Sequence, residues 1–185
     1  MTYGTLPGAY SRTAKVLHWS VAACVLATIP VAVAMTLVGR GGLQDALYFV
    51  HKSLGVLIFV LMLWRIAYRL LRGAPAAEPG LERWQRAASS AVHGLLYLML
   101  LAMPVVGYLG LSAFGAPTPV FGLFELPPIL AKDEALADRL FLLHKWSGFL
   151  VAGLAAVHIG AALQHHLILK DGVLRRMLPR ALGGR

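Results

Sequence analysis

Four apolar stretches, each long enough to cross a lipid bilayer, leave this chain very few folds to adopt. They are expected at residues 16–38, 50–71, 88–113 and 140–169. Crossing ~30 Å of hydrocarbon takes ~20 helical residues. Lipid offers the backbone no hydrogen-bond partners, and the stretches lack the two-residue alternation of a membrane β-strand, so each must be a helix. We therefore predict an all-α integral membrane four-helix bundle that forms a single domain over residues 1–185.

Composition and charge agree with a membrane location. Only 14% of the residues are charged, whereas a soluble domain carries about 25%. The net charge is +9, and most Lys and Arg residues lie near the two termini and in the second connection. Cytoplasmic loops collect such residues, so we expect both termini in the cytoplasm, where the basic side chains face anionic lipid and need no nucleic-acid partner. The single cysteine, Cys24, excludes a disulfide framework and a cysteine-bound iron–sulfur cluster.

Seven histidines lie in or at the ends of the apolar stretches, where ionisable side chains are costly and usually functional. They are His18, His51, His93, His144, His158, His165 and His166. In the predicted topology His51 and His144 both lie near the outer face. His158 follows His144 by fourteen residues, which is about 21 Å of helix rise and returns to nearly the same side of the helix. It therefore lies level with His18, near the cytoplasmic face.

This spacing predicts two pairs of facing imidazoles, His18 with His158 and His51 with His144. Neutral imidazole is a good ligand for haem iron, and two axial ligands favour electron transfer over oxygen binding. We therefore predict two b-type haems, an inner and an outer one. A zinc site fits less well, because zinc takes four ligands close together and these pairs are separated in depth. Histidines that only pack between helices, in a bundle without haem, are the simplest alternative.

Other polar residues are predicted to act close to the inner or the outer haem. Three histidines, His93, His165 and His166, are expected to bind quinone or carry protons, with packing or interfacial roles as the alternative. Arg65 follows His51 by fourteen residues, so one of Arg65 and Arg69 is expected to neutralise a propionate of the inner haem. Lys52 and Lys145 adjoin the outer pair and are expected to bind propionates or attract a small anion. For these two lysines and the two arginines, the alternative is that the side chains only reach the membrane surface and set the topology.

These residues resemble the bacterial cytochrome b561 family over nearly the whole chain. The matching features are Arg12…His18-Trp19, His51…Gly55, His93…Pro104-x-x-Gly107, His144 with His158, and the ending from Ala162 to Arg180. The resemblance implies a multi-pass cytochrome of the bacterial inner membrane with two b haems, held at His18, His51, His144 and His158. It also implies a superoxide oxidase, in which superoxide gives up an electron at the periplasmic side and ubiquinone is reduced.

A second function stays open beside superoxide oxidation. Related four-helix cytochromes dock to hydrogenases, dehydrogenases or periplasmic reductases and exchange electrons with quinone. The long, proline-rich third connection, residues 114–139, is a candidate docking surface for such a redox partner. The two functions differ in a simple way, because a superoxide oxidase works alone and a subunit needs its partner.

Overall fold

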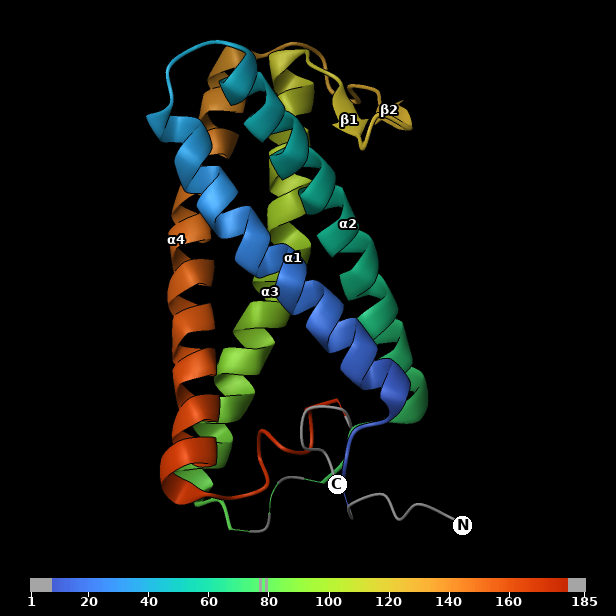
Figure 1. Cartoon of the computed structure of the whole chain (residues 1–185). Coiled ribbons are helices and arrows are strands. Elements are labelled where there is room, and N and C mark those ends of the chain that lie inside the picture. Colours follow the sequence, from blue (N-terminus) through green and yellow to red (C-terminus); the bar gives the residue numbers. More distant parts are fainter. Residues whose placement is uncertain (1–7, 77, 79, 180–185) are drawn as a thin grey trace.

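The computed structural model describes residues 8–76, 78 and 80–179 of the chain. Four long helices cross the molecule, followed by one turn of π-helix, and a two-stranded hairpin lies between the third and fourth helices (Figure 1). The elements are α1 (Arg12–Leu37), α2 (Gly42–Arg72), α3 (Arg83–Phe114), β1 (Thr118–Val120), β2 (Phe124–Leu126), α4 (Glu134–Gln164) and η1 (His165–Leu169). All four long helices are apolar enough to span a membrane, as the sequence predicts.

Each helix begins four to eight residues before the apolar stretch that marks it. The reason is local: hydropathy detects only the part that crosses lipid, whereas polar residues extend and cap the helix beyond it. Gln44, in the first turn of α2, donates to the Met35 and Val38 carbonyls at the end of α1. Asp133 caps α4 by accepting from the backbone N–H of Leu136. Residues 131–133 lead directly into α4.

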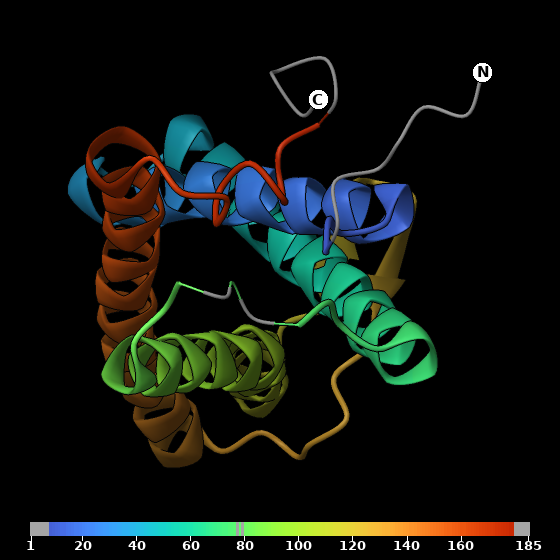
Figure 2. The same cartoon turned by 90° about the horizontal axis from the view of Figure 1, so that it is seen from below.

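The helices are arranged as two packed pairs. The backbone of α1 packs along α2, α3 packs along α4, and α2 also contacts α3 (Figure 2). The buried cluster where they meet is small and consists of Val21, Val25, Ile58, Met62 and Val151. Most other large apolar side chains are exposed on the outside of the bundle, which is where a membrane protein meets lipid.

One end of the bundle, here called the terminal end, is crossed by residues 170–179, the C-terminal strap. Lys170 adopts a left-handed conformation after η1, with φ 54°, and turns the chain back. The strap then reaches α1, because Trp19 Nε1 donates to the Met177 carbonyl at 3.0 Å and Lys15 Nζ donates to the Leu178 carbonyl at 2.8 Å. The C-terminal strap thus ties α4 to α1.

The opposite end, here called the hairpin end, carries an antiparallel ladder that the sequence analysis did not predict. Thr118 faces Leu126 and Val120 faces Phe124. A fully buried serine, Ser112 on α3, accepts from the backbone N–H groups of Ile129 and Leu130 and so holds the connection in place.

Candidate functional site

At the hairpin end, His51 on α2 faces His144 on α4. Their ring centroids are 5.9 Å apart and the ring planes are inclined by 84°. His144 Nδ1 lies 3.1 Å from the Met103 carbonyl of α3. A carbonyl only accepts, so this contact places the proton on Nδ1 and leaves Nε2 with a free lone pair. The Nδ1 atom of His51 is buried without a hydrogen-bond partner among the described residues.

At the terminal end, His18 on α1 faces His158 on α4. Their ring centroids are 6.1 Å apart, with an interplanar angle of 74°. A third imidazole, His93 on α3, lies 5.1 Å from His158. His93 Nδ1 is 2.6 Å from the Ser89 carbonyl, which leaves its Nε2 free as well. The closeness of His93 to His158 is a feature that depth alone did not reveal.

The two facing pairs have the spacing that a shared iron requires. A metal–imidazole bond is about 2 Å long, and adding the distance from nitrogen to ring centre on both sides gives about 6 Å between centroids. Small residues leave room for a flat macrocycle, since a Cβ added to Gly55 or Gly94 would meet no atom within 4 Å. Among the described residues, no three His, Cys, Asp or Glu side chains converge on one possible metal position. The residues present therefore fit bis-imidazole haem, although their role as ligands remains a prediction.

Gly107 on α3 is a part of the site that sequence reasoning did not explain. A Cβ at this position would lie 3.1 Å from the His144 ring, so the absence of a side chain lets the imidazole approach the backbone of α3. The signal was present in the Pro104-x-x-Gly107 motif, but without the fold nothing linked it to His144.

The predicted propionate residues meet in a recess at the terminal end. Arg65 Nε donates to the Tyr97 hydroxyl at 2.8 Å, and the guanidinium groups of Arg65 and Arg69 lie 5.5 and 5.9 Å from the Tyr97 ring centre. Together they line a shallow recess that also reaches Leu17, the neighbour of His18. In the part of the chain that is described, neither arginine pairs with a carboxylate. Two unpaired cations suit an anionic group such as a propionate.

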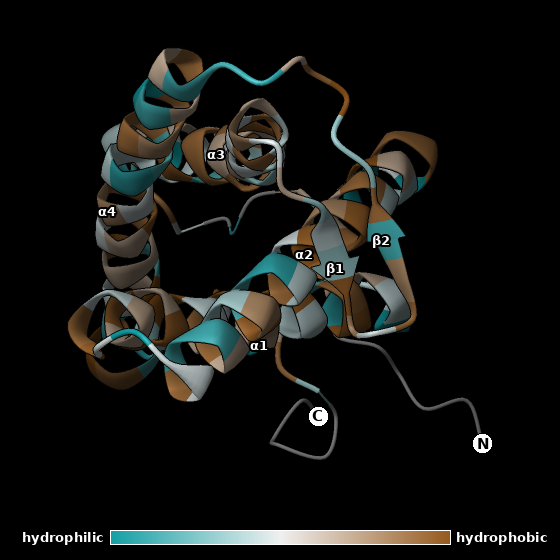
Figure 3. Ribbon diagram, turned by 90° about the horizontal axis from the view of Figure 1, so that it is seen from above, coloured by the Kyte–Doolittle hydropathy of each residue, from teal (hydrophilic) through white to brown (hydrophobic). Residues whose placement is uncertain are grey.

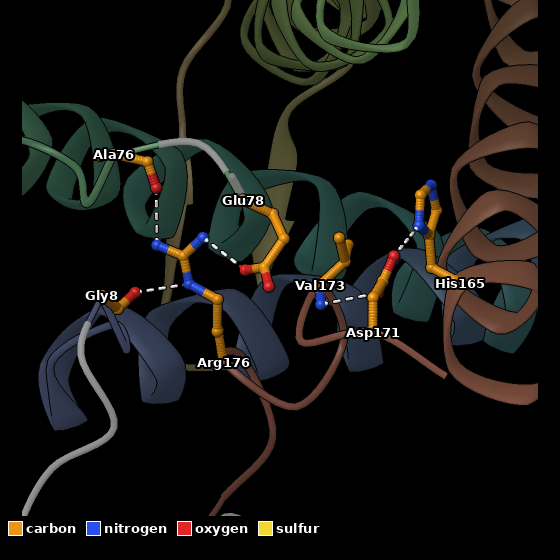
Figure 4. A network of polar contacts seen from close by, with 7 residues as sticks. All are labelled: Gly8, Ala76, Glu78, His165, Asp171, Val173 and Arg176. Atoms are coloured by element: carbon orange, nitrogen blue, oxygen red, sulfur yellow. Dashed lines mark hydrogen bonds and ion pairs between the residues drawn. The ribbon is translucent and has the colours of Figure 1, made fainter. Parts of the chain in front are cut away.

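The last predicted histidines lie where α4 becomes π-helical. His165 Nδ1 lies 2.5 Å from Asp171 Oδ2, and Asp171 Oδ1 accepts from the backbone N–H of Val173 at 3.0 Å (Figure 4). Asp171 therefore fixes the His165 ring, whose Nε2 faces away from the carboxylate. The Nδ1 atom of His166 is buried and has no partner among the described residues.

Lys52 and Lys145 lie next to the facing pair of the hairpin end. Lys52 is half-buried on α2 and Lys145 is exposed on α4. Neither forms an ion pair with any described residue. Their charges are therefore available to an anion that approaches this end.

Comparison with known proteins decides what kind of bundle this is. The model of the family described as prokaryotic cytochrome b561 matches residues 9–180. The chain belongs to this family. "Cytochrome b561 homolog 2" of Escherichia coli K12 is 34% identical over 182 residues, covering 98% of this chain and 97% of the relative. "Cytochrome b561 homolog 1" of the same organism is 31% identical over 175 residues, covering 92% and 97%. "Probable superoxide oxidase CybB" of Yersinia pestis is 31% identical over 140 residues, covering 76% and 79%.

Membership in the cytochrome b561 family makes the chain a multi-pass bacterial membrane protein that transfers electrons and binds haem b. The facing imidazoles are the groups in this structure that suit such a cofactor.

Proposed function

We propose that this protein is a di-haem cytochrome b of the bacterial inner membrane that takes electrons from superoxide and reduces ubiquinone. The observation that carries the proposal is the presence of two facing imidazole pairs at opposite levels of one bundle, His51 with His144 and His18 with His158. Haem held between such pairs supplies a one-electron carrier at each level. The basic terminal end lies in the cytoplasm in this proposal, and the hairpin end faces the periplasm.

The donor side needs little chemistry from the protein. Superoxide that loses one electron leaves as oxygen, so no proton has to be supplied. Lys52 and Lys145 attract the anion to the hairpin end, and their positive charges act over several ångströms because neither is neutralised nearby. The relative named as a probable superoxide oxidase supports this choice of donor.

The acceptor side needs protons, because a quinone takes up two electrons and two protons on its way to quinol. His165 is suited to deliver one of them from the terminal end. When the ring is protonated, Nδ1–H donates to Asp171 and the opposite group, Nε2–H, can donate to a quinone oxygen. His93, beside His158, has a second free Nε2, which can accept a proton and pass it on.

The proposal is tested with the purified protein, loaded with haem, in nanodiscs that contain ubiquinone. A steady source of superoxide should produce quinol at a rate that depends on the protein, and added superoxide dismutase should abolish it. If no quinol forms although both haems are reducible by dithionite, superoxide is not the donor. Reduction only after addition of a redox protein partner would favour the electron-transfer subunit instead.

Replacing both lysines near the outer pair should slow the reaction with superoxide. We expect the Lys52→Glu, Lys145→Glu variant to react about tenfold more slowly at low ionic strength and the difference to shrink as salt screens the charges. Stopped-flow absorbance at several salt concentrations measures it. The matched control is Lys132→Glu with Arg139→Glu, which makes the same change of charge at exposed positions of the same end. An equal effect in the control would mean that net charge, and not position, governs the rate.

Removing the charge of Asp171 should slow quinol formation. Asp171→Asn keeps an oxygen for the Val173 N–H but no longer holds the His165 proton on Nδ1. We expect quinone reduction to fall about tenfold or more, with unchanged haem content and an unchanged rate of haem reduction by superoxide. Separate measurement of these three quantities checks the prediction. An unchanged rate of quinol formation would show that His165 takes no part in quinone reduction.

A further inference from the structure

The connection between α3 and α4 is too apolar for a loop in water. Residues 115–131 contain a single charged residue, Glu125, where average composition would give about four. Three large apolar side chains at the turn of the hairpin are exposed: Leu123 by 80%, Phe124 by 53% and Phe121 by 44%. Hydropathy colouring shows one hydrophilic stretch in the hairpin, on β2 (Figure 3). A patch of this kind marks a surface that is covered in the working protein.

The hairpin lies on the outer side of the bundle and contacts α2 through β1 (Figure 1). Ser53, fully buried on α2, accepts from the Phe121 N–H at 2.9 Å and donates to the Pro119 carbonyl at 3.4 Å. Gly122 lies against Phe49, one turn earlier on the same helix. The hairpin is thus attached to α2 at Phe49 and Ser53, about two and three turns after the first residue of the helix, Gly42.

Helix length places this attachment at the edge of the hydrocarbon. The 31 residues of α2 extend about 46 Å, whereas the hydrocarbon is ~30 Å thick, so about 8 Å remains outside at each end. Ser53 follows Gly42 by eleven residues, which is about 16 Å. Ser53 therefore lies just inside the lipid boundary, in agreement with the predicted span that begins at residue 50, and the turn of the hairpin bonded to it lies close to that boundary.

Several backbone polar groups of the hairpin form hydrogen bonds within the protein and so do not depend on water. Besides the bonds to Ser53, Leu123 N–H donates to the Val120 carbonyl at 2.9 Å, and the two strands pair with each other. Pro119 has no N–H to satisfy. Non-helical backbone is excluded from hydrocarbon unless its polar groups find such partners, so these bonds lower the cost of a position close to the lipid boundary.

We propose that the β1–β2 hairpin is an interfacial anchor that inserts Phe121, Leu123 and Phe124 into the lipid of the hairpin-end leaflet. Successive side chains of a strand point to opposite faces, so Glu125 faces water when Phe124 faces lipid. Lipid is the occupant because the exposed apolar side chains lie at the depth of the lipid boundary, beside a helix that is itself apolar enough to span the membrane. The anchor requires neither superoxide nor quinone chemistry.

Single labelled cysteines test the proposal in the haem-loaded, full-length chain. The native cysteine is first removed by Cys24→Ala. An environment-sensitive fluorophore is then attached at Leu123→Cys, at Val60→Cys as an exposed mid-helix reference, or at Lys132→Cys as an exposed reference beside α4. Each protein is placed in nanodiscs of phosphatidylcholine and phosphatidylglycerol, and quenching by aqueous iodide and by doxyl-labelled lipid is measured.

We expect the label at position 123 to lose iodide quenching and to be quenched by lipid with a shallow doxyl group, whereas the label at position 132 shows the reverse. The label at position 60 should respond best to a deep doxyl group. Iodide quenching at position 123 equal to that at position 132 would overturn the proposal. Protection at position 123 that occurs in native membranes but not in nanodiscs would also overturn it, and would assign the patch to a protein partner.

Discussion

The His51→Ala variant is expected to bind about half as much haem as the unchanged protein, because it removes one of the two axial ligands at the hairpin end. The remaining haem should be the one between His18 and His158, whose ring centroids lie 6.1 Å apart on α1 and α4. His144→Ala should give the same product, and His18→Ala or His158→Ala the opposite one. Haem extracted per polypeptide, together with the reduced-minus-oxidised spectrum, measures the outcome. Reaction with superoxide should be lost with the haem of the hairpin end.

His93→Ala is the matched control for this series. The His93 ring lies 5.1 Å from the His158 ring. His93 is not one of the four assigned haem ligands, so its removal should leave both haems bound. If His93→Ala lost a haem while His18→Ala kept both, His93 would be the partner of His158 and the assignment at the terminal end would be wrong. Loss of the same spectral component in His51→Ala and His18→Ala would contradict the whole pairing.

The Arg176→Ala variant is expected to lose the docking of the C-terminal strap. The Arg176 side chain is buried and donates to the Gly8 and Ala76 carbonyls and to Glu78 (Figure 4). Its removal leaves a largely buried carboxylate and two carbonyls without their donor, since the side chain of Glu78 is only 24% exposed. Breaking a buried pair of this kind costs about 3 kcal/mol. The strap should then exchange its amide hydrogens rapidly and become sensitive to trypsin.

Arg175→Ala separates this effect from the loss of a positive charge. Arg175 is the exposed neighbour of Arg176 and makes no hydrogen bond or ion pair with the described residues. It should keep the strap protected, so hydrogen exchange and proteolysis of the two variants are compared in the same nanodiscs. Equal protection in both variants would show that the strap does not depend on the buried guanidinium group.

Rigid helix geometry explains how much of the site could be predicted. Once four apolar stretches are assigned to helices, the rise per residue gives each histidine a depth. His144 and His158 lie on one helix, and each could therefore be assigned a partner at its own level before any contact was known. The structure places His51 beside His144 and His18 beside His158. The prediction used only local regularity, which lipid enforces.

The features that were missed depend on contacts between distant parts of the chain. The hairpin has strands of only three residues, and their place is determined by Ser53, far away on α2. The contact of Gly107 with His144 depends on how α3 and α4 pack. Helix rise gives depth but not the position of α3 around the bundle, so the approach of His93 to His158 could not be predicted either.

The C-terminal strap changes the mechanical character of the bundle. Consecutive helices contact each other from α1 to α4, but the backbones of α1 and α4 are not packed along each other in the described chain. Lys15 and Trp19 bind the strap three residues before and one residue after His18, and η1 connects the strap to α4. An open row of four helices thereby becomes a closed ring. The strap therefore limits how far the helices that carry His18 and His158 can separate, although no hydrogen bond joins it to either imidazole in the described chain.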